Sequence, residues 1–357
     1  MRETAILERD LTRALEEIRP ADEERMAQAR RHWDAVAKPL HGLGLLEDVV
    51  VRMAGVAPLG RDLKKAVAAF CADNGVVAQG VTQTDSSVTA VVAGNMLTGK
   101  ASVCCMSRVA GAKVFPVDAG MVTEVEGLRS IKVRRGTRDL SQEPAMTRQE
   151  CLSVLLAGMD IARELSEMGC GLLAAGEMGI GNTTTSAAVA CALLDRPAED
   201  FTGRGAGLSD AGLARKVAAV RKALALNRPD PADPLDVLAK VGGFDLAGLC
   251  GVFLGGAACR VPVLADGLIS TVAALCAVRL CPGAAKAVFA SHVSAEPAGR
   301  AVLDALGKQP LITAGMRLGE GTGAVASIPL WDMARAVYAE SYSFAQCGVE
   351  AYQPQGG

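Results

Sequence analysis

From residue 64 to residue 194, short apolar runs typical of strands alternate with longer runs typical of helices. The strand-like runs are 67–72, 113–117 and 171–175, and the helix-like runs are 88–106, 151–168 and 184–194. Strands that alternate with helices form right-handed βαβ units, and their strands lie parallel in one sheet. The sequence therefore predicts an α/β fold, in which ligands bind at the carboxyl ends of the strands.

The composition agrees with this fold class. The chain has 357 residues, of which half are apolar and only 3% aromatic, and it contains 39 glycines. Such a mixture suits helices packed closely on a parallel sheet better than an all-β sandwich. Ahead of the alternating region, 3–18 and 21–36 are charged and amphipathic, which predicts two helices, the second ending at Lys38-Pro39.

Charge and cysteine content exclude several functions. A net charge of -2 and a pI near 6.0 provide no large positive field, so we expect no nucleic-acid partner. The longest apolar stretches, 246–259 and 267–278, fall short of the roughly 18 residues that span a bilayer, so we expect no membrane contact. Eleven cysteines without a Cys-x-x-Cys pair or a leader-like segment indicate reduced thiols in the cytoplasm. The three histidines lie far apart in the sequence, so we expect no metal site.

A glycine-rich segment, 175–186, follows the apolar run that ends at residue 174 and precedes a helix-like run. Backbone N–H groups and the side chains of Asn182 and Thr183 at such a turn suit a phosphate. The segment has no Walker lysine and lacks the dinucleotide spacing of glycines, so ATP and NAD are disfavoured. An ordinary strand-to-helix connection is the alternative interpretation.

A second glycine-rich segment, 315–324, places Glu320 among four glycines. Glycine allows the backbone to approach a ligand closely, and a carboxylate in the same space can act as a base. The alternative is a helix cap followed by a turn, with Glu320 as a solvated charge.

Three other segments lie at predicted carboxyl ends. Asp73 and Asp266 each follow an apolar run, where the carboxylate either orients a ribose or substrate or forms an Asx-turn. Ser291 and Ser294 are possible phosphate ligands, and the alternative there is an N-cap before a helix that begins near Pro297.

These motifs, taken in order, resemble the nicotinate-nucleotide:dimethylbenzimidazole phosphoribosyltransferases of cobamide biosynthesis. The resemblance covers nearly the whole chain. Its matching segments are 38–39, 72–73, 176–184, 203–205, 210–216, 241–244, 266–267, 294–296, 317–323 and 344–345.

The resemblance implies a large Rossmann-like domain with flanking helices (61–330) and a small helical domain formed by both termini (1–60 and 331–357). It also implies transfer of ribose 5-phosphate from nicotinate mononucleotide to an aromatic lower-ligand base, without a cofactor. The protein is then a homodimer, or a heterodimer with a paralogue.

The resemblance also assigns roles to individual residues. Glu320 matches the catalytic glutamate that deprotonates the acceptor, and Glu177 matches a second carboxylate beside it. The residues expected to bind the phosphate, ribose and nicotinate are Gly176, Gly179, Asn182, Thr183, Gly203, Arg204, Lys216, Asp266, Ser291 and Gly319. Those expected at the acceptor pocket are Asp73, Asn74, Thr82, Ser86 and Leu318.

Two departures from the family pattern concern the acceptor. Asn74 stands where most relatives have His, and Ser86 stands where most have the Gln of the acceptor pocket. A smaller side chain changes both the room and the hydrogen bonding in a pocket. The alternatives to a dimethylbenzimidazole enzyme are therefore a phenol- or p-cresol-accepting subunit of a heterodimer, or a catalytically silent partner subunit. Because both glutamates are retained, the sequence argues against a silent subunit.

Overall fold

One parallel sheet forms the centre of the protein. The computed structural model describes residues 2–60 and 63–352, and within them six strands lie in the order β3-β2-β1-β4-β5-β6. Their bounds are β1 (Lys64–Ala72), β2 (Ala112–Gly120), β3 (Arg129–Ser130), β4 (Cys170–Met178), β5 (Val263–Ala265) and β6 (Val288–Ala290). The order reverses between β1 and β4, and open α/β sheets bind ligands at such a switch point.

The register of the two central strands places the site. Ala69 pairs with Gly176 and Phe70 with Glu177, so Glu177 stands near the carboxyl end of β4. Both strands are almost wholly buried and rich in alanine, which lets helices pack close to each face.

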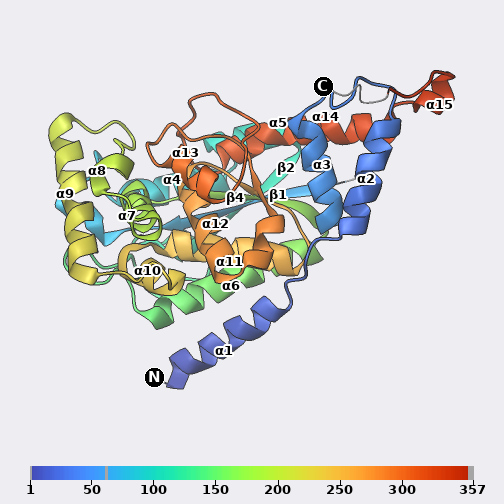
Figure 1. Cartoon of the computed structure of the whole chain (residues 1–357). Helices are drawn as coiled ribbons and strands as arrows, with labels where there is room; N and C mark the ends of the chain where they lie inside the picture. The colour runs from blue at the N-terminus through green and yellow to red at the C-terminus, as the bar shows by residue number, and fades with distance from the viewer. Residues whose placement is uncertain (1, 61–62, 353–357) are drawn as a thin grey trace.

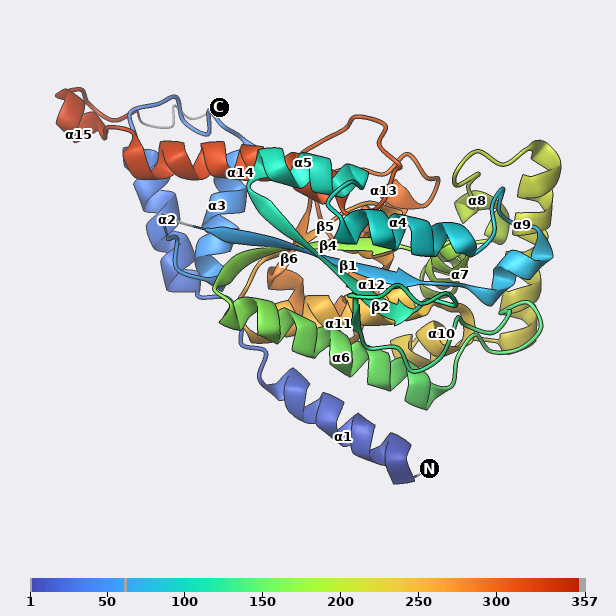
Figure 2. The same ribbon diagram turned by 180° about the vertical axis from the view of Figure 1, so that it is seen from behind.

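Helices cover both faces of this sheet (Figure 2). On one face lie α4 (Ser87–Leu97), α5 (Ser102–Ala110) and α14 (Thr322–Glu340), and on the other α6 (Arg148–Glu167) and α11 (Phe244–Ala258). The remaining elements of the large unit are η1 (Gly75–Gln79), α7 (Asn182–Leu194), α8 (Ala198–Phe201), α9 (Asp210–Asn227), α10 (Pro234–Val241), α12 (Leu268–Leu280), η2 (Pro282–Lys286) and α13 (Gly299–Ala305).

Helices from both ends of the chain meet beside the sheet (Figure 1). There α2 (Glu23–Ala35) and α3 (Leu45–Val56) pack with the carboxyl-terminal half of α14 around Trp33, Val50 and Ala334. The short α15 (Phe344–Cys347) extends from this end. The predicted α/β class, with a parallel sheet and a small helical unit, is confirmed.

The first helix lies elsewhere. α1 (Arg2–Glu16) packs on α6 and α11, away from α2 and α3. The proposed domain boundaries, 1–60, 61–330 and 331–357, stay a prediction, and residues 1, 61–62 and 353–357 within them lie outside the described residues.

The predicted helix-like run 88–106 forms two helices instead of one. Gly99 adopts a positive φ of 73°, and the Asn95 carbonyl accepts from the N–H groups of Lys100 and Ala101, so α4 ends and α5 starts afresh. By length and composition alone, the combined stretch Ser87–Ala110 is long and apolar enough to cross a membrane. The break divides it into two short helices that pack on β1, β2 and α14.

The contact between α6 and α11 depends on glycine. A Cβ at Gly251 would overlap the Leu155 carbonyl oxygen, and a Cβ at Gly158 would overlap the Gly248 carbonyl oxygen. Both obstacles are backbone atoms, which cannot rotate away. The two helices therefore approach closely only because these side chains are absent.

We predict that Gly251→Ala lowers the free energy of unfolding by about 1–3 kcal/mol, because the methyl group forces the helices apart. Urea denaturation measures the loss. The control is Gly94→Ala on α4, where the nearest atom to the new Cβ is 4.0 Å away. It should be neutral or stabilise by about 1 kcal/mol. Equal effects of the two substitutions would contradict the close helix contact.

Candidate active site

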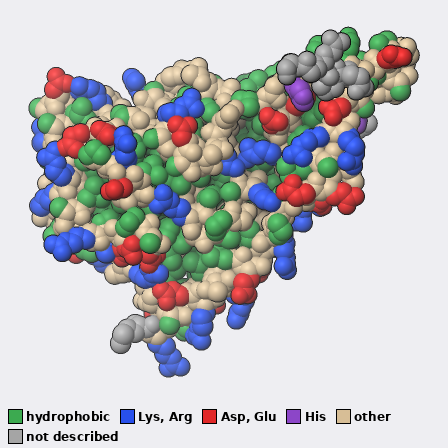
Figure 3. Space-filling model, in the orientation of Figure 1, with side chains coloured by type: hydrophobic (Ala, Val, Ile, Leu, Met, Phe, Trp, Pro, Cys, Tyr) green, Lys and Arg blue, Asp and Glu red, His purple; other side chains and the backbone are tan. Residues whose placement is uncertain are grey.

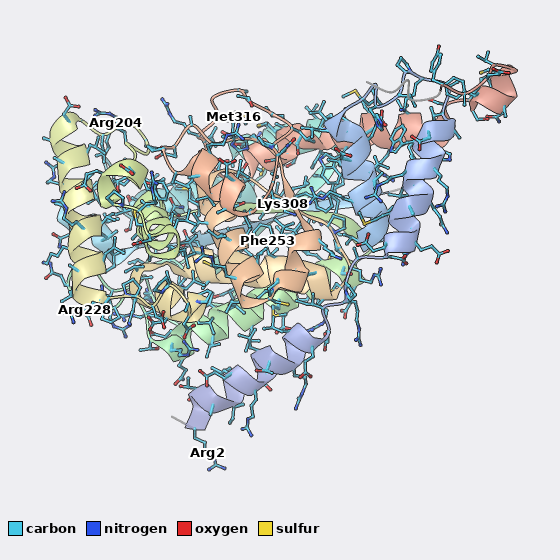
Figure 4. All side chains as sticks on the ribbon, viewed as in Figure 1. Arg2, Arg204, Arg228, Phe253, Lys308 and Met316 are labelled. Atoms are coloured by element: carbon cyan, nitrogen blue, oxygen red, sulfur yellow. The ribbon has the colours of Figure 1, made fainter. Side chains whose placement is uncertain are left out.

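A cavity of about 310 Å³ opens at the carboxyl ends of the strands. The turn after β4, the segments after β5 and β6, and the loops at 81–84, 204–206 and 317–320 line it. Arg204 and Met316 mark two of the bordering loops in Figure 4. The two glycine-rich segments singled out in the sequence thus face one space.

Glu177 lies on the wall of this cavity and is buried. The Asn182 amide, in the first turn of α7, donates a hydrogen bond to its carboxyl group. Burial raises the pKa of Glu177 to about 8, and the charges of Asp245 and Asp266 contribute to that rise. Near neutral pH the side chain is therefore mainly protonated.

Glu320 reaches the same point from the other glycine segment. Its N–H donates to the Glu177 carbonyl at 3.1 Å, and its backbone is left-handed with a φ of 62°. A Cβ at Gly319 would lie 2.5 Å from Glu177 Oε1, so glycine is needed where the two carboxyl groups converge. The structure thus brings the carboxyl groups of the two glycine-rich segments together.

The carboxylate of Glu320 also binds the start of a helix. Val103 N, in the first turn of α5, donates to Glu320 Oε2 at 3.1 Å. Burial raises the pKa of Glu320, and the bond from Val103 opposes that rise. Glu320 is more exposed than Glu177 and has a donor that favours its charged form, so it is the better candidate for a base.

Asp266 is buried behind Glu320, and both of its carboxylate oxygens accept hydrogen bonds from backbone N–H groups. Its Oδ1 accepts from Gly323 N at 2.6 Å and Ala324 N at 3.0 Å, and its Oδ2 accepts from Gly321 N at 3.1 Å. These are the orphan N–H groups at the start of α14. Burial raises the pKa of Asp266, while His292 and these N–H groups lower it.

His292 is a wall residue that sequence reasoning missed, because the histidines were considered only as metal ligands. Its Nδ1 lies 3.8 Å from Asp266 Oδ1 and 3.2 Å from Ser291 Oγ. Burial lowers the pKa of His292, so it is mainly neutral at pH 7. The available signal was its place directly after the apolar run that forms β6. In the described residues no cluster of three His, Cys, Asp or Glu side chains is arranged to hold a metal.

The wall of the cavity also carries a cation, Lys216. Lys216 of α9 is fully buried, and its Nζ donates to Thr183 Oγ1 at 2.7 Å. Burial lowers its pKa to about 8, and Glu296 opposes that change. A Cβ at Gly205 would lie 3.4 Å from Lys216 Nζ. A lysine, a hydroxyl and the amino end of α7 therefore surround one point, as a phosphate requires.

The structure brings most of the predicted site residues to this cavity. Its wall contains Thr82, Glu177, Gly179, Asn182, Thr183, Arg204, Lys216, Asp266, Leu318, Gly319 and Glu320.

Six other predicted residues do not line the cavity: Gly176, Gly203, Ser291, Asp73, Asn74 and Ser86. Two of them are glycines that make room for neighbours, since a Cβ at Gly176 would lie 2.5 Å from the Glu320 carbonyl oxygen and one at Gly203 would overlap Glu296 Oε2. Ser291 Oγ donates to the Ala265 carbonyl at 2.6 Å, which turns it away from the cavity.

The three remaining residues stand behind the wall. Asp73 Oδ2 accepts from Val122 N at 2.8 Å, and Asn74 Nδ2 donates to the Ile180 carbonyl at 3.3 Å. Ser86 is the residue before α4, and its hydroxyl helps to lower the pKa of Asp73, which burial raises. Their predicted role in acceptor binding stays a prediction.

The chain is similar to known phosphoribosyltransferases in sequence and in structure. A phosphoribosyltransferase family model matches residues 18–349. The nicotinate-nucleotide–dimethylbenzimidazole phosphoribosyltransferase of Acetivibrio thermocellus is 45% identical, over 97% of this chain and 99% of its own. The enzyme of the same name from Chloroflexus aggregans is 44% identical, over 95% and 98%. The crystal structure of CobT from Thermus thermophilus superposes with a TM-score of 0.86 at 42% identity, over 92% of this chain and 100% of that one.

We predict that Glu177→Gln flattens the pH dependence of stability. Between pH 4.5 and about 8 the folded protein holds a proton on Glu177 that the unfolded chain has released, so the free energy of unfolding falls as pH rises. Glutamine does not titrate, so the variant should lose less stability across this range. Urea denaturation at pH 5 and pH 8 measures the difference.

The control for this measurement is the exposed Glu126→Gln, which should follow the wild-type pH dependence. Parallel pH curves for wild type and Glu177→Gln would mean that Glu177 is not protonated in the folded state.

Proposed function

Since the chain belongs to the nicotinate-nucleotide–dimethylbenzimidazole phosphoribosyltransferase family, we propose that it moves ribose 5-phosphate from nicotinate mononucleotide to 5,6-dimethylbenzimidazole. The products are α-ribazole 5-phosphate and nicotinate. The observation that carries this proposal is the convergence of Glu320 and Glu177 in a cavity whose wall also holds Lys216 and Thr183.

The reaction needs little acid catalysis. The bond between ribose C1 and the pyridinium nitrogen breaks, and its electron pair leaves with nicotinate as a neutral ring. Positive charge then builds on the ribose, beside buried carboxyl groups. Their ionisation is costly without a partner and becomes favourable beside a cation. One ring nitrogen of the acceptor attacks C1 through its lone pair, and the proton on the other ring nitrogen must leave.

Glu320 is the group that we assign to this proton. At neutral pH Glu177 is mainly protonated, because burial raises its pKa to about 8. Glu320 is the more exposed of the two and accepts a hydrogen bond from Val103 N, which favours its ionised form. Glu177, as the protonated acid, then acts by position, and Asp266 acts by position and charge.

The phosphate of the nucleotide fits beside Lys216. Thr183, in the first turn of α7, meets Lys216 there, and Arg204 lies on the bordering loop. Each of these groups favours a dianion.

Apolar wall residues provide a place for the acceptor ring. Val92, Met178, Ile180 and Leu318 line the cavity together with Glu320.

Incubation of the purified protein with nicotinate mononucleotide and dimethylbenzimidazole should yield α-ribazole 5-phosphate, identified by mass spectrometry. Phenol and p-cresol are the comparison acceptors. A higher kcat/KM for either phenol would contradict the proposed acceptor.

We also propose a homodimer located in the cytoplasm. Exposed apolar side chains gather on α4 and α5, where Val91 is 60%, Leu97 44% and Val109 87% exposed, which suits burial against a second copy. Sedimentation of the purified chain tests the dimer. Activity that requires an added paralogue would indicate a heterodimer.

We predict that Glu320→Gln lowers kcat by about a hundredfold or more, because the acceptor proton loses its base. Steady-state assays with dimethylbenzimidazole measure the change. Nucleotide binding should persist, since the phosphate side is untouched. Turnover close to that of wild type would remove Glu320 from the proposed mechanism.

We predict that nicotinate riboside, which lacks the phosphate, binds at least about tenfold more weakly than nicotinate mononucleotide, because charge-assisted hydrogen bonds are lost. Calorimetry measures both affinities. The preference should shrink in Lys216→Gln and persist in Lys222→Gln, an exposed substitution on the same helix. A preference unchanged in Lys216→Gln would place the phosphate elsewhere.

A further inference from the structure

A second cavity, of about 530 Å³, shares no lining residue with the first. It lies between α2–α3 and two segments of the large unit, the end of η2 before β6 and the loop after α13. Figure 3 shows Lys and Arg side chains gathered on this face of α3, and Figure 4 shows Lys308 between α13 and α3. Because Lys286 precedes β6 while His292 follows it, the two cavities open at opposite ends of this strand.

Two cations meet in this second cavity. Arg52 donates to the Val288 carbonyl at 2.8 Å and stacks 4.5 Å from the centre of the Phe289 ring. Lys308 Nζ donates to the Ala285 carbonyl at 2.6 Å. In the parts of the chain that the structure describes, neither side chain has a carboxylate within ion-pair distance, whereas the neighbouring Lys286 pairs with Glu23 at 3.3 Å.

The proximity of these two cations is unfavourable unless an anion lies between them. Burial lowers the pKa of Lys308 to about 7, and the charge of Arg52 contributes to that change. Burial also lowers the pKa of Arg52, opposed by the exposed Asp48. Partly buried charges of one sign call for a counterion between them.

The rest of the cavity wall is partly apolar. Met26, Leu45, Val49 and Leu311 line the same space, together with the carboxylates of Glu23 and Asp48. A bare inorganic anion would leave this surface uncovered, whereas a ring would bury it. The planar fork of an arginine matches a carboxylate with two parallel hydrogen bonds.

We propose that this second cavity binds a small carboxylate that carries an apolar ring, between Arg52 and Lys308. The site is separate from the catalytic cavity, and it joins the helical unit of α2 and α3 to the large unit.

Benzoate and its uncharged analogue benzamide, titrated by calorimetry into the full-length protein, test the proposal. Benzoate should bind saturably, and benzamide at least about tenfold more weakly. Lys308→Gln should weaken benzoate by about tenfold or more, while Lys308→Arg, which keeps the charge, should bind within about threefold of wild type. Arg204→Gln, in the catalytic cavity, should leave benzoate affinity unchanged.

Thermal unfolding of each variant shows that it is folded. Benzamide binding as tightly as benzoate would overturn the proposal, as would benzoate affinity unchanged in Lys308→Gln or the absence of saturable binding. Inorganic phosphate binding more tightly than benzoate would contradict the apolar part of the ligand.

Discussion

The hydrogen bonds that Asp266 accepts hold together the part of the protein that contains the candidate active site. Its two oxygens receive three N–H groups at the start of α14, and this fixes the segment that carries Glu320. Glu320 itself is left-handed, a conformation that costs a non-glycine residue roughly 1–2 kcal/mol. The charge of a buried carboxylate at a helix amino end offsets such a cost.

Burial of acidic groups explains how one site serves a cationic reaction. Glu177, Asp245, Asp266 and Glu320 lie near one another, and burial raises the pKa of each. Burial therefore makes these carboxyl groups resist ionisation unless a cation lies beside them. A pyridinium nucleotide, and then a positively charged ribose, restores the partner that each charge lacks. The site is therefore complementary to the positive charge of the substrate and to the charge that moves onto the ribose during the reaction.

The sequence predicted the parallel sheet from its apolar runs and ligand binding from its two glycine-rich segments. Both predictions were possible because apolar runs and glycines restrict the backbone directly. The sequence placed Glu177 and Glu320 at the same edge, since carboxyl ends of parallel strands meet there. The sequence does not specify the direction in which a side chain at such an end points. In the structure Asp266 accepts hydrogen bonds from backbone N–H groups, and the Ser291 hydroxyl points away from the cavity.

The remaining differences between the pattern of the sequence and the structure arise from tertiary packing. Lys216 sits in a helix whose pattern looks solvated, yet a neighbouring loop and Thr183 bury it. Ser86 follows the motif expected of an acceptor pocket, and the structure places it directly before α4, outside the cavity lining. The break between α4 and α5 depends on hydrogen bonds of one carbonyl, that of Asn95, which no periodicity displays.

The role of Glu320 as proton acceptor is the central claim, and one comparison tests it directly. The ratio of wild-type to Glu320→Gln turnover is measured with dimethylbenzimidazole and with its N-methylated form, which has no ring N–H to lose. A large ratio with dimethylbenzimidazole and a ratio near one with the methylated acceptor are expected. Equal losses with both acceptors would contradict the assignment, because Glu320 would then act without receiving the acceptor proton.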